Sequence, residues 1–85
     1  MKLVETAKFK RLRKRIKETH EKAALKEAIN KIIENPQSGK ILNGEFKDLR
    51  SFKYTVKGQN KRLIYKTEKD FLVLFSFGPR EGIYK

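Results

Sequence analysis

The chain has 85 residues, with 22 Lys and Arg against 10 Asp and Glu, and its formal net charge is +12. A chain of this length supports one hydrophobic core, so we expect a single domain over residues 1–85. The absence of cysteine excludes disulfides and thiolate chemistry, while the charge favours a polyanionic partner, most often nucleic acid, over an anionic membrane surface or an acidic protein.

The first third of the chain is predicted to form a strand and then two helices. Apolar and polar side chains alternate in part over residues 2–5, as in a strand. Thr6 can cap a helix by accepting a hydrogen bond from a backbone N–H. A second helix is expected from about His20, and Asn35-Pro36 ends it because proline disfavours helical geometry in the residue before it. Apolar side chains recur at helical spacing in both helices: Phe9, Leu12 and Ile16 in the first, Leu25, Ala28, Ile29 and Ile32 in the second. The two helices are expected to form a hairpin.

The N-terminal segment also bears on where the protein acts. Residues 1–15 carry charges throughout and lack the apolar core of a signal peptide. Nowhere does an apolar run approach the length of a membrane span. We therefore expect a cytoplasmic protein with no membrane partner.

The second half of the chain changes to strand character. Residues 37–48 show no period and are predicted to form an ordered loop anchored by Ile41, Leu42 and Phe46. Strands are expected over 52–57, 62–66 and 71–77, with a turn at 58–60. The last strand is apolar on both faces, which is typical of an interior strand. The expected fold is α+β, with an N-terminal strand and a two-helix hairpin packed on a mainly antiparallel sheet of about four strands.

The sequence offers few groups for metal or cofactor chemistry. His20 is the single histidine and lies at a predicted helix turn, where a solvated residue is the simpler interpretation. There is no carboxylate pair at ligand spacing and no glycine-rich phosphate loop, since Gly78-Pro79 is typical of a turn. We expect neither a metal site nor a cofactor.

Basic and tyrosine side chains gather in the strand half instead. Period-two alternation places Lys53, Thr55 and Lys57 on one face of a strand, opposite Phe52, Tyr54 and Val56. Cations interleaved with aromatic rings suit RNA, because phosphates pair with the cations and unstacked bases lie on the rings. A solvated surface without function is the alternative. The full set is Lys53, Tyr54, Lys57, Lys61, Arg62, Tyr65, Arg80, Tyr84 and Lys85.

Several segments in order resemble the RelE/ParE superfamily of toxins from toxin–antitoxin systems. They are Val4-Glu5-Thr6 leading into Phe9, Pro36 through Leu42-Asn43-Gly44, Leu49-Arg50-Ser51-Phe52-Lys53, Arg62-Leu63-Ile64-Tyr65, and Phe77-Gly78-Pro79-Arg80 followed by Tyr84-Lys85. The ending is similar to archaeal-type RelE sequences. RelE-type members are ribosome-dependent mRNA interferases, ParE-type members inhibit DNA gyrase, and both are neutralised by an antitoxin. The resemblance implies an acidic antitoxin partner and leaves the two activities open.

The resemblance to the RelE branch implies a catalytic site. Lys53, Arg80 and Tyr84 match its basic strand residue, its phosphate-contacting arginine and its C-terminal tyrosine, whereas its second strand lysine falls on Thr55 here. Arg80 and then Arg62 suit the developing phosphorane charge, because a guanidinium bonds two phosphate oxygens at once. The predicted activity is metal-independent cleavage of mRNA through the 2′-hydroxyl, with Lys53, Arg62, Arg80 and Tyr84 as catalytic residues.

Further cations are assigned to RNA binding. Lys57, Lys61 and Lys85 are expected to lie beside the catalytic residues, whereas Arg11, Arg13, Lys14 and Arg15 of the first helix are expected to contact ribosomal RNA. The expected partners are the ribosome, mRNA and an acidic antitoxin protein. A gyrase inhibitor of the ParE type and a non-catalytic RNA-binding module are the alternatives. Oligomeric state does not follow from the sequence.

Overall fold

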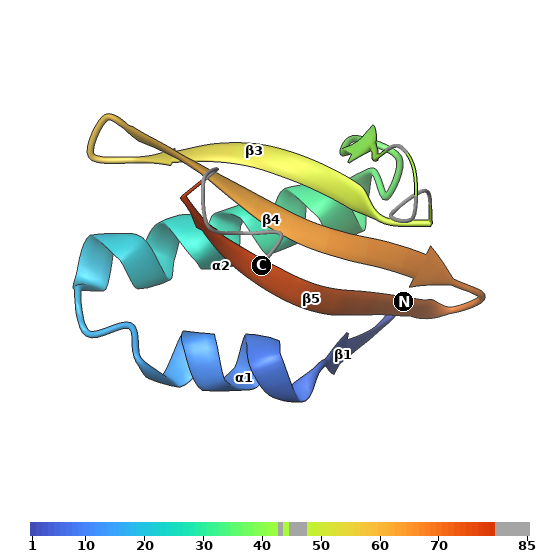
Figure 1. Cartoon of the computed structure of the whole chain (residues 1–85), viewed down its shortest axis with the longest axis horizontal. Helices are drawn as coiled ribbons and strands as arrows, with labels where there is room; N and C mark the ends of the chain where they lie inside the picture. The colour runs from blue at the N-terminus through green and yellow to red at the C-terminus, as the bar shows by residue number, and fades with distance from the viewer. Residues whose placement is uncertain (43, 45–47, 80–85) are drawn as a thin grey trace.

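The computed structural model describes residues 1–42, 44 and 48–79, and over these it is an α+β fold with helices on one face of a mixed sheet (Figure 1). Its elements in chain order are β1 (Lys2–Glu5), α1 (Ala7–Lys14), α2 (Thr19–Glu34), β2 (Lys40–Ile41), β3 (Arg50–Val56), β4 (Gln59–Glu68) and β5 (Phe71–Pro79). The predicted fold class is confirmed.

The described strands form one five-stranded sheet in the order β1-β5-β4-β3-β2. β1 runs parallel to β5, with Lys2 beside Phe71, and the other neighbours are antiparallel. The sheet has one strand more than expected because β2 lies inside the predicted loop over 37–48. Two residues are too short a segment to show a period, so only their pairing with Arg50 and Ser51 reveals them. The interior position predicted for β5 is correct.

Both helices begin where a side chain accepts their first free N–H groups. The Thr6 hydroxyl accepts from the Phe9 amide at 3.2 Å and donates to the Phe75 carbonyl at 3.1 Å, which joins the start of α1 to β5. The Glu18 carboxylate accepts from the amides of His20 and Glu21, so α2 begins at Thr19, one residue before the predicted start. The caps therefore attach each helix to a defined point of the chain.

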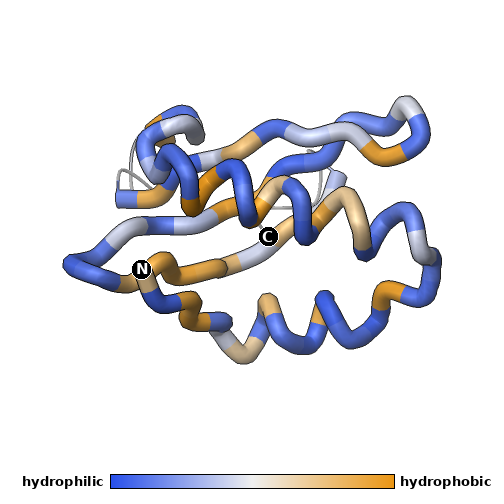
Figure 2. The backbone as a smooth tube through the Cα atoms, turned by 180° about the vertical axis from the view of Figure 1, so that it is seen from behind, coloured by the Kyte–Doolittle hydropathy of each residue, from blue (hydrophilic) through white to orange (hydrophobic). Residues whose placement is uncertain are grey.

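The hydrophobic core lies between the helices and one face of the sheet, which we call the inner face. Figure 2, seen from behind, shows apolar segments recurring along both helices on this side. The Phe9 ring meets the Phe77 ring edge-on, with 5.1 Å between centroids. The largest fully buried side chains are Tyr65, Phe9, Ile32, Leu63, Leu72 and Leu74.

Polar contacts hold the start of the segment after α2. The Tyr65 hydroxyl donates to the Pro36 carbonyl at 2.9 Å and accepts from the Gly39 amide at 2.8 Å, while the Arg50 guanidinium donates to the Gly39 carbonyl at 2.8 Å. Ile41 is 53% exposed, so its predicted anchoring role is wrong. Phe46 lies outside the described residues.

The β3–β4 hairpin turns earlier than predicted. Val56 pairs with Gln59, and the turn consists of Lys57 at φ 49° and Gly58 at φ 82°. Two positive φ values give the twist that two-residue hairpins need, and glycine supplies the second at no steric cost. The expected turn over 58–60 is therefore wrong, and β4 begins at Gln59.

Candidate nucleic-acid interface

Two cations face each other on the outer face of the sheet, the side away from the helices. Lys53 of β3 is the register partner of Arg62 in β4, and Arg62 is in turn opposite Gly78 in β5. Neither cation makes an ion pair or a side-chain hydrogen bond with any residue that the structure describes. Like charges directly opposite each other destabilise a sheet, so this pair is suited to an anion that bridges it.

Two features lie beside this cation pair, an uncrowded glycine and a buried row of side chains. A Cβ added at Gly78 would meet no atom within 4 Å, and the φ of 149° favours glycine at this position. In the next row of the register, Ser51, Ile64 and Ser76 lie side by side and are all buried. The Ser51 hydroxyl is buried and has no hydrogen-bond partner among the described residues. An anionic ligand on Lys53 and Arg62 therefore has space next to Gly78.

Lys61 lies on the opposite side of β4 from Arg62. Its ammonium is 2.7 Å from the Glu21 carboxylate of α2, and its side chain is only 13% exposed. Consecutive strand residues point to opposite faces, so two cations that are adjacent in the sequence serve different surfaces. The structure does not bring Lys61, predicted to bind RNA, to the cation pair.

Lys57 is also apart from the outer face. It occupies the β3–β4 turn with positive φ, and its ammonium is 3.3 Å from the Glu18 carboxylate at the start of α2. The prediction that it shares a strand face with Lys53 and Thr55 is wrong, because the turn changes the direction of the chain before Lys57. Hydrogen bonds from His20 and from Lys57 lower the pKa of Glu18 to about 2.

The basic residues of α1 form a second cationic surface, on the helix side of the molecule. Arg13 bonds Glu5 of β1 through two guanidinium nitrogens, and this pairing lowers the pKa of the Glu5 carboxyl. Arg11, Lys14 and Arg15 line a shallow hollow with Ala7 and Lys10. Of the four cations predicted to contact ribosomal RNA, Arg13 thus has a carboxylate partner within the chain.

The remaining predicted site residues, Arg80, Tyr84 and Lys85, lie outside the described residues. β5 ends at Pro79, one residue after the Gly78 that faces Arg62. Sequence reasoning missed Ser51 and Ser76 beside the cation pair. Period-two alternation back from Lys53 would have placed Ser51 on the outer face, whereas Ser76 needed the irregular register between Ile64 and Tyr65 to be known.

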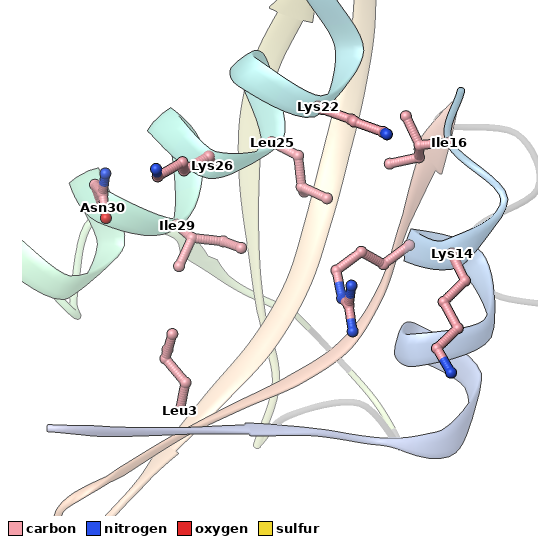
Figure 3. A pocket seen from close by; sticks show the side chains of 9 residues that line it. Leu3, Lys14, Ile16, Lys22, Leu25, Lys26, Ile29 and Asn30 are labelled. Atoms are coloured by element: carbon pink, nitrogen blue, oxygen red, sulfur yellow. The ribbon is translucent and has the colours of Figure 1, made fainter. Parts of the chain in front are cut away.

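A groove with an apolar floor separates α1, α2 and β1. It holds about 510 Å³, and the side chains of Leu3, Ile16, Leu25 and Ile29 point toward one another across it (Figure 3). Basic residues surround it: Arg13, Lys14, Lys22 and Lys26. Leu3 is exposed, whereas Ile16 and Leu25 are buried at the floor. An apolar groove with a charged rim suits an amphipathic segment of a partner.

Two structural findings bear on other kinds of site. Within the described part of the chain, neither helix is long and apolar enough to span a membrane. Among the same residues, no three His, Asp or Glu side chains lie close enough together to bind a metal ion.

Comparison with known proteins identifies a family. The model for the ParE-like toxin of type II bacterial toxin-antitoxin system matches residues 3–85, nearly the whole chain. The predicted resemblance to the RelE/ParE superfamily is confirmed by this match. No curated protein matches the chain.

Proposed function

Because the chain belongs to the ParE-like toxin family of type II toxin–antitoxin systems, we propose that it is the toxin that cuts messenger RNA on the ribosome, in the cytoplasm. The observation that carries this proposal is the cation pair of Lys53 and Arg62. Two juxtaposed cations without a described carboxylate partner suit a phosphodiester, whose two free oxygens share one negative charge.

The proposed reaction transfers the phosphoryl group of the message from a 5′-oxygen to the neighbouring 2′-oxygen. The 2′-hydroxyl gives its proton to water and its oxygen bonds to phosphorus, while the bond to the 5′-oxygen breaks and that oxygen takes a proton from water. Negative charge accumulates on the two non-bridging oxygens in the transition state. Arg62 and Lys53 stabilise that charge in the transition state. Arg80 supplies a further cation in the proposal, and Tyr84 stacks on a base to hold the attacking oxygen in line.

The proposal gives the basic surface of α1 a separate role. Arg11, Lys14 and Arg15 lie on the helix side of the sheet, away from the cation pair, so they can contact ribosomal RNA while the outer face contacts the message. A site made of few cations cannot orient a flexible message by itself. The ribosome supplies that orientation.

An antitoxin partner follows from the family, and the groove between α1, α2 and β1 suits part of it. We place there an amphipathic acidic segment whose apolar side chains cover Leu3, Leu25 and Ile29. Its carboxylates would meet the surrounding lysines and arginines, which is the charge complementarity that a +12 chain offers.

The second candidate function is inhibition of DNA gyrase. The description of the family as ParE-like favours it, because ParE-type toxins act on gyrase. The outer cation pair would then bind an acidic surface of that enzyme or its DNA. Both functions use cations, so activity measurements must separate them.

Primer extension on a defined message in a translating extract tests the proposal. We expect new 5′ ends within the translated region when the toxin is added, and none when the same message is free of ribosomes. A supercoiling assay with purified gyrase is run in parallel. Intact message together with blocked supercoiling would replace the proposed function with the second candidate.

A further inference from the structure

Within the part of the chain that the structure describes, most of β3 has no strand beside it on one side. β2 pairs only with Arg50 and Ser51, so from Phe52 to Val56 no described strand covers the edge away from β4. Figure 1 shows the short β2 near one end of β3. An uncovered edge exposes backbone donors and acceptors that can bind another extended chain.

The pairing pattern identifies the backbone groups on that edge. The Leu42 amide donates to the Leu49 carbonyl at 3.0 Å, so odd-numbered residues of this segment bond toward β2. Even-numbered residues, from Arg50 to Val56, bond toward β4. Because these directions alternate in an antiparallel strand, the N–H and C=O groups of Lys53 and Thr55 point to the uncovered edge.

A groove runs between this edge and α2. It holds about 280 Å³ and is lined by Ala24, Glu27, Ala28 and Lys31 of α2 and by Phe52, Lys53, Tyr54 and Thr55 of β3. The alanines leave room for side chains of an added strand. The Tyr54 side chain is buried beside this groove.

The charged side chains along this groove favour one kind of partner over others. The Glu27 carboxylate is 3.5 Å from the Lys31 ammonium, which leaves Lys53 as the cation without a described partner along this groove. A second copy of the chain would bring its own Lys53 and a net charge of +12 to the same edge. Lysine on an edge strand discourages self-pairing in this way, whereas a carboxylate on the incoming strand would neutralise it.

We propose that the edge of β3 at Lys53 and Thr55 binds an extended acidic segment of a partner protein, which adds a strand to the sheet beside α2. Alternate side chains of that strand face the two sides of the sheet. Those on the outer side are acidic and meet Lys53. Those on the inner side are small or β-branched and lie over Ala24 and Ala28. The interaction itself does not depend on the proposed RNA cleavage, although a strand here would cover one of the two proposed phosphate-binding cations.

The probe is a seven-residue blocked peptide of alternating Glu and Val, titrated into the ¹⁵N-labelled full chain at low salt. We expect saturable shifts centred on the amides of Lys53 and Thr55. A peptide of alternating Lys and Val should bind at least about tenfold more weakly, because it brings like charge to Lys53. No nuclease activity is measured, so failure of the proposed function would leave this result unchanged.

Matched variants locate the binding site. Thr55→Pro removes one edge donor and should weaken binding about tenfold, whereas Thr55→Val retains the donor and should bind as the parent. Lys53→Glu should weaken binding similarly, and Lys2→Glu, which reverses a charge on the opposite edge strand, should not. Peptide N-methylated on the amides that face β3 tests the same bonds with the parental protein, even if Thr55→Pro fails to fold.

Three outcomes would overturn the proposal. They are shifts centred on β1 instead of β3, equal binding of the N-methylated peptide, and no saturable binding at millimolar peptide. Self-association of the parental chain through Lys53 and Thr55 would show that a second copy is the occupant instead.

Discussion

The two faces of the sheet use their cations differently. On the helix side or at its margin, three cations have carboxylate partners: Arg13 with Glu5, Lys57 with Glu18 and Lys61 with Glu21. On the outer face, Lys53 and Arg62 lie opposite each other with no described carboxylate nearby. The three paired cations connect elements of the fold, whereas Lys53 and Arg62 are available to a ligand.

Lys61 and Arg62 show the same difference at two consecutive positions. Lys61 connects β4 to α2, and Arg62 is directed to the opposite side, where its register partner is another cation. Net charge therefore says little about which cations bind nucleic acid. The side of the strand on which each one lies decides that.

The largest expected effect is on activity, from Arg62→Ala. Loss of a charge-assisted phosphate contact in the transition state should lower the rate of message cleavage by about a hundredfold or more. Stability should change little, since Arg62 has no described ion pair to lose. The measurement is primer extension on ribosome-bound message, with ribosome affinity checked by co-sedimentation. Arg80→Ala is expected to have the same phenotype. Cleavage at the parental rate would remove Arg62 from the site.

The next effect is on stability, from Gly39→Ala. A Cβ at this position would be 2.6 Å from the Tyr65 hydroxyl oxygen and 2.7 Å from its Cε1, and the tyrosine is fully buried. The ring cannot move without disturbing the core, so we expect a loss of about 1–3 kcal/mol in the free energy of unfolding by urea. Lys40→Ala, at an exposed neighbour, should stay within about 0.5 kcal/mol of the parent. If Gly39→Ala has the same free energy of unfolding as the parent, the Tyr65 side chain can move to make room for the added Cβ.

Lys61→Ala tests the other half of the comparison. The substitution removes the ion-pair partner of the half-buried Glu21. The unpaired carboxylate should lower the free energy of unfolding by about 1–2 kcal/mol. This is less than for a fully buried pair, because Glu21 remains partly solvated. Urea unfolding measures the loss. Cleavage per folded molecule should match the parent, in contrast to Arg62→Ala. A stable but inactive Lys61→Ala would contradict the assignment of the two cations to different roles.

The smallest effect concerns acid stability and Glu18. Its pKa of about 2 in the folded state is below the usual 4.5, so the ionised form stabilises the fold above the unfolded pKa, and this contribution is lost as pH falls toward 2. The Tm of Glu18→Gln should therefore be lower than that of the parent near neutral pH and converge with it toward pH 2. Thermal scans from pH 2 to 7 measure the difference. A difference in Tm that stays constant with pH would mean that the Glu18 side chain caps α2 through hydrogen bonds and that its charge contributes nothing.

The sequence predicted the parts of the fold that depend on local pattern. The helical spacing of Phe9, Leu25 and Ile32 identified the core side chains of both helices, and the strand β1 was predicted with its observed bounds. The turn at Lys57 was misplaced, because nothing local in the sequence favours a positive φ for lysine. β2 was missed because it exists only through its pairing with β3.

The sequence by itself determined the fold class, the family resemblance and a strongly cationic surface, since composition, periodicity and motif order are properties of the chain alone. Only the tertiary structure decided which cations have a carboxylate partner among the described residues. Lys61 and Arg62 carry the same charge in the same segment, and no local rule distinguishes them. Their difference comes from long-range packing: α2 brings Glu21 to Lys61, and β3 brings Lys53 to Arg62. The partner of each charge is a residue distant in the sequence. Only the folded structure brings the two together, so the sequence alone does not identify the partner.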